Sequence, residues 1–199
     1  MDKINRHRMP LKPGVRNSKM LQIVTAPNPV LSTKAKSVNK VDKAILNLIE
    51  QMEEALDKAT DPIGVGLAAP QVGKSLDLFI TKPTAKSKIF VFINPKITDK
   101  NSIPEEKDNK KTFKLEGCLS LVNIWGEVQR SPEITVEYLD ETGKKHNRQF
   151  RGFLATIIQH EVDHLNGVLF PKRVLEQKGT LYQSSKNSKG EDEFEELKI

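Results

Sequence analysis

The sequence contains little cysteine, few aromatic residues and no long apolar run. Its 199 residues include one Cys, one Trp and two Tyr. One cysteine permits no intrachain disulfide, which is typical of a reducing compartment, so we expect a cytoplasmic protein. No apolar stretch approaches the roughly 18 residues that span a membrane, and the N-terminal residues lack the apolar core of a signal peptide. We therefore expect one folded domain and no membrane partner.

Basic charge is concentrated at one end of the chain. Residues 1–40 contain nine Lys or Arg and one acidic residue, a net charge of +8, whereas the remaining residues carry 23 basic and 25 acidic side chains. The basic end could attract phosphate, for instance in ribosomal RNA, although a solubilising arm explains the same charge. We expect an irregular basic extension at 1–19, no DNA partner and a monomer. The two prolines and one serine of this extension disfavour a transit peptide.

Two of the four histidines lie four residues apart in the segment QHEVDH, residues 159–164. On a helix, His160 and His164 share one face and can bind one metal ion, while Glu161 lies beside them. This H-E-x-x-H arrangement is typical of metal-dependent hydrolases, in which the carboxylate handles protons. The surrounding apolar residues predict a half-buried helix that stops near Gly167. An exposed helix that is merely rich in histidine is the alternative.

A catalytic metal site needs a third protein ligand. The other histidines, His7 and His146, lie in polar stretches and are interpreted as solvated surface residues. Cys118 is the one cysteine, and a lone cysteine is usually a small buried apolar residue. Because Gly117 before it lets the backbone approach a ligand closely, Cys118 could join the two motif histidines and leave the fourth position open to water.

Three segments of the chain together resemble the motifs of the peptide deformylase family. They are GVGLAAPQVG at 64–73, EGCLS at 116–120 and QHEVDH at 159–164, in the order expected for that family. The similarity extends from about Leu21 to about Val174. Val122 stands where a common form of the second motif has proline, which leaves the course of residues 121–125 open.

The resemblance implies a reaction and a set of ligands. Family members remove the N-formyl group from the initiator methionine of new polypeptides and release formate. The implied ligands are Cys118, His160 and His164, which hold one divalent ion. The family uses Fe(II) in cells and accepts Zn(II), Ni(II) or Co(II). Coordination lowers the pKa of a bound water toward about 7, and Glu161 acts as general base and then as general acid.

Further site residues follow from the resemblance and from helical spacing. The side-chain amide of Gln71 and the backbone N–H of Leu119 would stabilise the developing oxyanion. The pocket for the methionine side chain is expected on the helix face that precedes His160. The substrate-binding candidates are Val65, Gly66, Leu67, Gly117, Trp125, Phe153, Thr156 and Ile157. Core packing is the alternative for the large apolar members of this set.

Three further charged residues, Glu116, Arg130 and Asp163, lie near the predicted ligands in the sequence. They are interpreted either as a buried ionic network that fixes the Cys118 loop or as solvated surface charges. Their spacing does not distinguish the two.

The segments between the motifs predict an α+β fold, with short antiparallel sheets packed around a central metal-binding helix. The clearest helix covers 41–59, with Asp42 as its cap. The glycine-rich segment 64–73 is interpreted as a loop that brings backbone groups against a peptide, and the polar residues 98–112 as a surface loop. Strands are predicted at 76–81, 89–93, 127–130, 134–139 and 146–151.

The predicted domain organisation has three parts. Residues 1–19 form the basic extension and 20–176 the catalytic domain. Residues 177–199 form a polar, acidic tail without a core-forming pattern, disordered or weakly helical. Removal of both ends is expected to leave activity on a small formyl-peptide nearly unchanged.

Two other functions remain open. An H-E-x-x-H endopeptidase would normally take its third ligand from a histidine or glutamate further along the chain, which the early position of Cys118 disfavours. A basic ribosome-associated factor with only a structural metal would need neither Glu161 nor Gln71.

Overall fold

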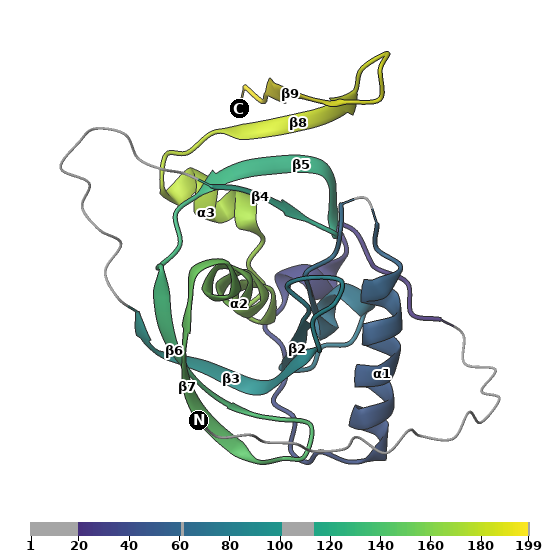
Figure 1. Cartoon of the computed structure of the whole chain (residues 1–199), viewed down its shortest axis with the longest axis vertical. Helices are drawn as coiled ribbons and strands as arrows, with labels where there is room; N and C mark the ends of the chain where they lie inside the picture. Colours follow the sequence, from purple (N-terminus) through teal and green to yellow (C-terminus); the bar gives the residue numbers. More distant parts are fainter. Residues whose placement is uncertain (1–19, 61, 101–113, 199) are drawn as a thin grey trace.

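The structure describes residues 20–60, 62–100 and 114–198 of a computed structural model. The basic extension 1–19, with His7, and most of the predicted surface loop 98–112 lie outside these residues. No helix in the described part has the length and the apolar run that crossing a membrane requires. The described residues form two antiparallel sheets with a helix between them (Figure 1).

Five antiparallel strands form the larger sheet, in the order β1-β2-β3-β6-β7. They are β1 (Gly66–Ala68), β2 (Leu78–Thr81), β3 (Phe90–Lys100), β6 (Glu133–Leu139) and β7 (Lys145–Arg151). Successive side chains of a strand point to opposite faces. In β2 both faces are covered, because Leu78 and Ile80 pack in one core cluster and Phe79 packs in another. This strand therefore lies at the centre of the domain.

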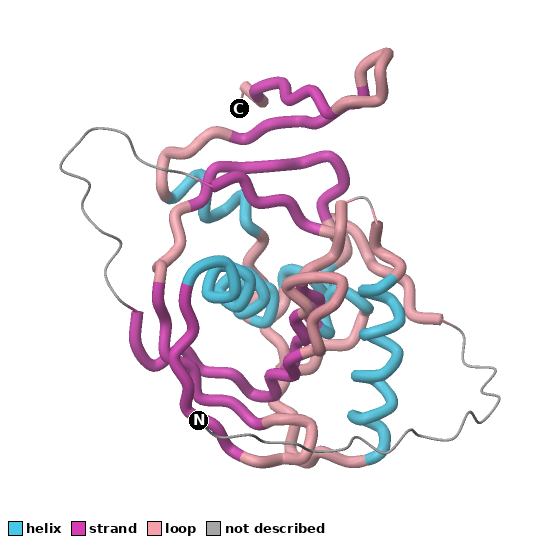
Figure 2. The backbone as a smooth tube through the Cα atoms, in the orientation of Figure 1, coloured by secondary structure: helices cyan, strands magenta, loops and turns pink. Residues whose placement is uncertain are grey.

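Four antiparallel strands form the smaller sheet, in the order β4-β5-β8-β9. They are β4 (Lys114–Cys118), β5 (Leu121–Val128), β8 (Leu181–Lys186) and β9 (Asp192–Glu196). The short helix α3 (Phe170–Glu176) packs against it through the buried residues Phe170 and Val174. Figure 2 shows this sheet at the top of the molecule, with β9 outermost.

Helix α1 (Lys43–Asp57) and helix α2 (Gly152–Leu165) begin where the sequence predicts them. The Asp42 carboxylate accepts hydrogen bonds from the N–H groups of Ala44 at 2.9 Å and Ile45 at 3.0 Å, which satisfies donors that have no partner within the helix. Helix α2 ends at Leu165. Two residues later, Gly167 has a φ of 68°, a conformation that glycine adopts without strain. Two 3-10 turns, η1 (Pro29–Ser32) and η2 (Ala69–Val72), complete the helical elements of the described part.

The core consists of three apolar clusters, one of which includes residues of α2. One lies between α1 and the larger sheet, and a second joins α2 to the opposite side of that sheet through Ala155 and Ile158. The third joins α3 to the smaller sheet. Helix α2 is thus held between the two sheets, and the predicted α+β fold with antiparallel sheets around a central helix is confirmed (Figure 1).

Several strand boundaries differ from the prediction. β3 does not stop at Asn94 and Pro95 but continues to Lys100, so residues 98–100 are strand and not loop. The pairing of β3 with β6 shifts register between Ile93 and Lys96, which lets the strand pass the proline. Of the predicted strand 127–130, residues 127 and 128 form the end of the longer β5, whereas 129 and 130 lie outside it, and β4 was not predicted. Within the glycine-rich segment 64–73, residues 66–68 form β1.

The largest correction concerns the C-terminal residues. Residues 181–196 are neither disordered nor helical but form the hairpin of β8 and β9, and β8 pairs with β5. His146 is also not a solvated residue. Its ring stacks on Tyr138 with centroids 5.2 Å apart, and its Nε2 lies 2.6 Å from Asp140 Oδ2.

Candidate metal centre and cavity

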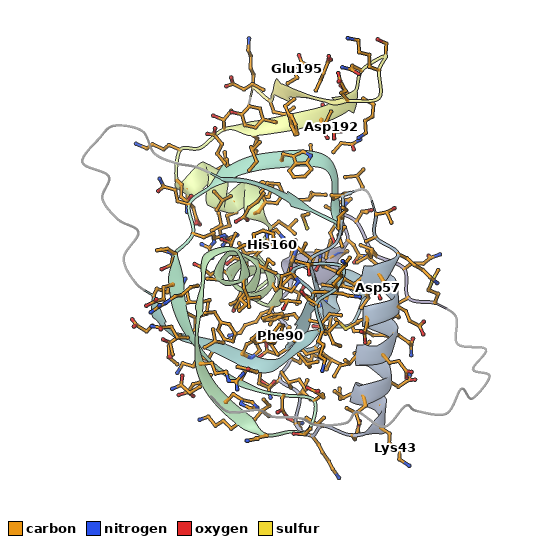
Figure 3. The ribbon with its side chains drawn as sticks, in the orientation of Figure 1. Lys43, Asp57, Phe90, His160, Asp192 and Glu195 are labelled. Atoms are coloured by element: carbon orange, nitrogen blue, oxygen red, sulfur yellow. The ribbon has the colours of Figure 1, made fainter. Side chains whose placement is uncertain are left out.

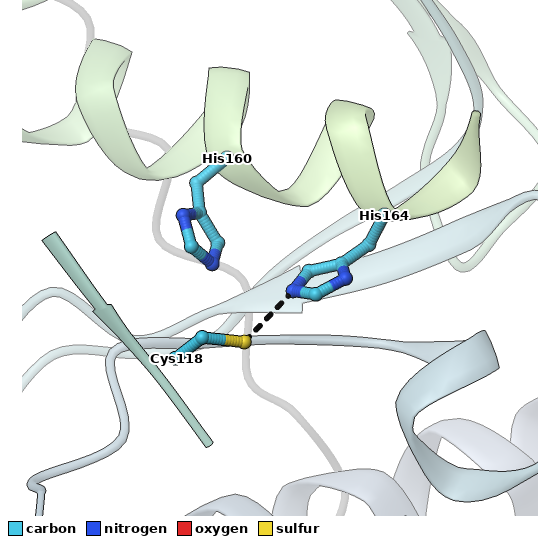
Figure 4. Close-up of side chains that lie close together, drawn as sticks. All are labelled: Cys118, His160 and His164. Carbon is cyan, nitrogen blue, oxygen red and sulfur yellow. Dashed lines mark hydrogen bonds between the residues drawn. The ribbon is translucent and has the colours of Figure 1, made fainter. Parts of the chain in front are cut away.

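Three metal-ligating side chains meet where the end of β4 approaches the middle of α2. Helical spacing places His160 and His164 on one face, with ring centroids 5.0 Å apart. Cys118 Sγ lies 3.2 Å from His164 Nε2, and one ligand atom from each of the three residues lies within 4.8 Å of the others. Figure 4 shows the thiol facing the two rings. Among the described residues no other His, Cys, Asp and Glu set forms such a group.

The backbone around Cys118 is shaped by a tight reversal between β4 and β5. The pairing of the two strands shifts register between Gly117 and Cys118. The indole of Trp125 lies against Gly117, where an added Cβ would lie 2.9 Å from a ring carbon. A side chain at 117 would therefore displace the indole or the strand that carries the cysteine.

The chemistry of the donor set fits a divalent metal ion. Burial alone would raise the pKa of the Cys118 thiol, but the charge of His164 and hydrogen bonds with both rings lower it to about 5. The thiolate, which is the form that binds metal, is thus favoured at neutral pH. His160 Nδ1 lies 3.0 Å from Glu116 Oε2, which leaves Nε2 of the same ring free to face the cysteine. The three residues can hold a single metal ion.

A buried ionic network surrounds Glu116, whose carboxylate lies against His160. Arg130 donates two hydrogen bonds of 2.9 Å to the carboxylate of Glu116 and one of 2.6 Å to Asp163. Of the two interpretations left open by the sequence, the buried network is therefore the one observed. Arg173 of α3, which sequence reasoning missed, donates to the same Asp163 at 2.7 Å. No motif marks Arg173, since only the packing of α3 brings it there.

Glu161 is buried beside His160, but its hydrogen bonding differs from that of Glu116. Its Oε2 has no hydrogen-bond partner among the described residues. Its Oε1 occupies the space above Gly66, where an added Cβ would lie 2.4 Å away. Burial raises the pKa of Glu161 to about 7, although the nearby charges of His160 and His164 oppose the rise. A carboxylate with this pKa can take and return a proton near neutral pH.

The side chain of Gln71 is fixed at the same place. Its Oε1 accepts a 2.8 Å hydrogen bond from the N–H of Ala68, while its Nε2 lies 3.6 Å from Cys118 Sγ and 3.3 Å from Ser120 Oγ. The amide donor therefore points toward the thiol. Both the side chain and its anchoring N–H are buried, so the orientation is rigid.

A cavity of about 260 Å³ opens onto this centre. Its lining combines the candidate metal ligands Cys118 and His160 with other residues of β1, β4, β5 and α2. Predicted residues that line it are Val65, Gly66, Gln71, Gly117, Leu119, Trp125, Phe153, Thr156, Ile157 and Glu161. Lining residues that were not predicted include Pro62, Ile63 and Leu115.

One predicted pocket residue lies elsewhere. Leu67 is fully buried in the cluster between α1 and the larger sheet and does not line the cavity. Because neighbours in a strand face opposite sides, the side chain of Leu67 points away from the carboxylate that lies over Gly66. A strand assignment for this segment would have separated the two residues.

Comparisons with known proteins identify the family of this chain. The family model described as polypeptide deformylase matches residues 20–179. A peptide deformylase of Pseudothermotoga lettingae is 43% identical over 143 residues, which cover 72% of this chain and 76% of the relative. A peptide deformylase of Borreliella burgdorferi is 39% identical over 150 residues, covering 75% and 85%.

Solved structures of the same family have the same fold. The peptide deformylase of Thermotoga maritima is 36% identical and superposes with a TM-score of 0.68, covering 79% of this chain and 99% of that one. The peptide deformylase of Synechococcus elongatus in complex with actinonin is 34% identical, with a TM-score of 0.70 and coverage of 85% and 86%. The protein therefore belongs to the polypeptide deformylase family, whose members are hydrolytic metalloenzymes.

Proposed function

We propose that the protein removes the N-formyl group from the initiator methionine of newly made polypeptides and releases formate. The family supports deformylation of such chains. The observation that carries the proposal is the buried Glu161, one of whose carboxylate oxygens has no hydrogen-bond partner among the residues the structure describes, beside a Cys-His-His group that borders a cavity. A structural metal site would require neither the unpaired carboxylate nor the opening.

The proposed cofactor is one divalent ion held by Cys118, His160 and His164. When bound, such an ion polarises a carbonyl group and makes hydroxide available near neutral pH. We propose Fe(II) as the ion in cells, with Zn(II), Ni(II) and Co(II) able to replace it, because a thiolate makes the ligand set softer than one of imidazoles and carboxylates.

Different residues around the ligands are proposed to transfer the proton and to stabilise the developing charge. Glu161 accepts the proton of the attacking water and returns it to the leaving amine. The amide of Gln71 and the backbone N–H of Leu119 donate to the oxygen that gains charge, and one such donor is worth roughly 3 kcal/mol. Gln71 is suited to this role because its own oxygen is held by Ala68.

The peptide is proposed to lie between the two sheets. β1 ends the larger sheet and β4 ends the smaller one, so each has an edge that no other described strand pairs with. Residues of both strands line the cavity. An extended peptide placed there can pair with either edge. The methionine side chain would then contact Phe153, Thr156 and Ile157 of α2, an apolar wall that suits a flexible thioether.

The partners of the protein follow from the same proposal. Its substrate is the N-formylmethionyl end of a nascent chain in the cytoplasm, and we propose a monomer. The net charge of +8 on residues 1–40 supports contact with ribosomal RNA. Binding to ribosomes that weakens as salt rises is the expected result, and binding that is independent of salt would contradict it.

The experiment that tests the function is formate release from formyl-Met-Ala-Ser by protein purified without oxygen, with metal analysis of the same sample. Formate release that stops on chelation and returns with Fe(II) is expected. Casein is the control for the endopeptidase alternative. Cleavage of casein without formate release would refute the proposal, and so would a metal-loaded protein inactive on both substrates.

A further inference from the structure

The C-terminal hairpin lies beyond the part of the chain that matches the family. The family match ends at residue 179, whereas β8 and β9 cover residues 181–186 and 192–196. The hairpin nevertheless belongs to the domain, because β8 pairs with β5 at Ile124, Trp125 and Gly126. Figure 3 places Asp192 and Glu195 on the hairpin at the outer end of the molecule and His160 at its centre.

Two hairpin side chains hold the indole of Trp125. Its Nε1 donates a 3.1 Å hydrogen bond to the buried Ser184 Oγ of β8. The ring of Phe194 on β9 meets it edge-on, with centroids 5.8 Å apart and an interplanar angle of 85°. Ser184 and Phe194 are paired across the hairpin, so both act on the indole from one face of the sheet. The indole also lies against Gly117, whose lack of a side chain leaves space for the ring.

The indole so held is a wall of the cavity that contains Glu161. It also borders a second cavity of about 150 Å³, to which the hairpin contributes Ser184, Ser185, Lys186 and Asp192 and β4 contributes Cys118. The hairpin thus reaches the metal centre through Trp125 and through this second space. In the large cavity, the residues of α2 are proposed to contact the methionine side chain. Trp125 is therefore available to contact the residues that follow methionine in the peptide.

We propose that the C-terminal hairpin is a positioning element for substrate, in which Ser184 and Phe194 fix Trp125 as the surface that contacts the peptide downstream of formylmethionine. The inference rests on the proposed function. It gives a role in peptide recognition to residues 181–196, which touch no reacting group, and it makes Trp125 a determinant of affinity and not of the chemical step.

Fluorescence tests the first half of this inference directly, because Trp125 is the one tryptophan of the chain. Replacing Phe194→Ala or Ser184→Ala should shift the emission to longer wavelength and increase quenching by acrylamide. Phe194→Tyr should restore the parent emission, since it keeps the ring. Glu195→Ala is the matched control, because Glu195 is the next residue of the same strand and points to the opposite face.

Kinetics on formyl-Met-Ala-Ser test the second half. Phe194→Ala should raise KM about threefold to tenfold, the change expected when one aromatic pair is lost. kcat and metal content should stay as in the parent, and Glu195→Ala should change neither constant. Phe194 is 45% exposed, so its removal should still allow folding. Phe194→Leu provides a second variant that keeps apolar bulk and should show the same rise in KM.

The outcomes separate this inference from the proposed function. A parent protein that releases no formate refutes the proposed function. An active parent whose Phe194→Ala and Ser184→Ala variants keep the parent KM refutes the inference alone, whatever their emission. Unchanged emission in both variants refutes it as well, because the hairpin would then not fix the indole.

Discussion

Two buried glutamates, Glu116 and Glu161, lie close to His160, and their surroundings differ. On the β4 side, Glu116 receives two hydrogen bonds from Arg130 and lies 3.0 Å from His160 Nδ1. Burial would raise the pKa of Glu116, but these partners lower it to about 2. Glu161 of α2, by contrast, has an oxygen without a partner in the described part of the chain, and burial raises its pKa to about 7.

The difference shows that donors, and not burial, decide what a carboxylate does here. Both side chains are almost completely buried, at 7% and 3% exposure. Glu116 is charged near neutral pH and can orient the imidazole of His160, whereas Glu161 can change its protonation state in that range. We therefore expect Glu116 to form a support for His160 and Glu161 to form a reactive face, and each can be disrupted separately.

Removing the imidazole of His160, which lies close to both glutamates, should have the largest effect on activity. His160→Ala is expected to lose both the metal ion and the activity, because two protein ligands do not form a catalytic site. Metal analysis and formate release on the same sample measure this. His146→Ala, which removes the partner of a carboxylate far from the cavity, should keep both. Full metal occupancy in His160→Ala would overturn the ligand assignment.

Changing the reactive face alone should separate metal binding from turnover. Glu161→Gln keeps the shape of the side chain and removes its capacity to accept a proton. We expect normal metal content and a loss of at least about 10²-fold in kcat, the low end of general acid–base catalysis. Near-normal turnover in a metal-loaded sample would show that Glu161 has another role.

Disrupting the support should affect stability first. Arg130→Met leaves Glu116 buried without its two donors and is expected to lower the free energy of unfolding by about 3–5 kcal/mol. Metal affinity should fall by about 10–100-fold, as when the partner of a ligand histidine is removed. Chemical denaturation and metal titration measure the two effects. Lys145→Met, in an exposed pair with Glu137, is the control and should change stability by less than about 1 kcal/mol.

The apolar wall beside the reactive face should control substrate size. Ile157 is 4% exposed and lines the cavity next to Glu161. Ile157→Trp should raise KM for formyl-Met peptides about tenfold, the effect of a small change in a hydrophobic pocket, and leave metal content intact. The ratio of kcat/KM between formyl-Met and formyl-Ala peptides is the measurement. An unchanged ratio would place the methionine pocket elsewhere.

The partly buried pair of Asp140 and His146 lies nearer the surface than the pair of Glu116 and His160 and should contribute least. Burial opposes ionisation of Asp140, but hydrogen bonds from Thr142, His146 and the N–H of Lys144 lower its pKa to about 2. Because the folded pKa is depressed, this stabilisation is present above about pH 4 and is lost as pH falls toward 2. Asp140→Asn should cost about 1 kcal/mol at neutral pH and remove that part of the acid dependence. An unchanged acid transition would contradict the pairing.

The parts of the fold that could be predicted depend on residues close together in the sequence. Helix α1 follows from its apolar spacing and from Asp42, whose contacts lie two and three residues away. The shared face of His160 and His164 follows from helical geometry alone. The hairpin of β6 and β7 follows from alternating patterns around the turn at Gly143.

The parts that could not be predicted depend on distant pairing. The polar composition of 181–196 gives little strand signal, and the hairpin forms because β5 offers an edge to β8. Leu67 was assigned to the pocket because a loop has no alternation, whereas the pairing of β1 with β2 turns that side chain into the core. Arg173 reaches Asp163 only because α3 packs beneath the smaller sheet.

By itself the sequence determined the helix that carries His160 and His164, the order of three motifs and, through the one cysteine and the few histidines, which side chains could bind a metal ion. The tertiary structure alone decided that Cys118 Sγ lies 3.2 Å from His164 Nε2, that Glu116 is saturated with donors while Glu161 is not, and that Trp125 is held by a hairpin. The reason is that helical periodicity is set within three or four residues. Hydrogen-bond partners and burial, which set the pKa values of Glu116 and Glu161, come from segments that meet only when the chain folds.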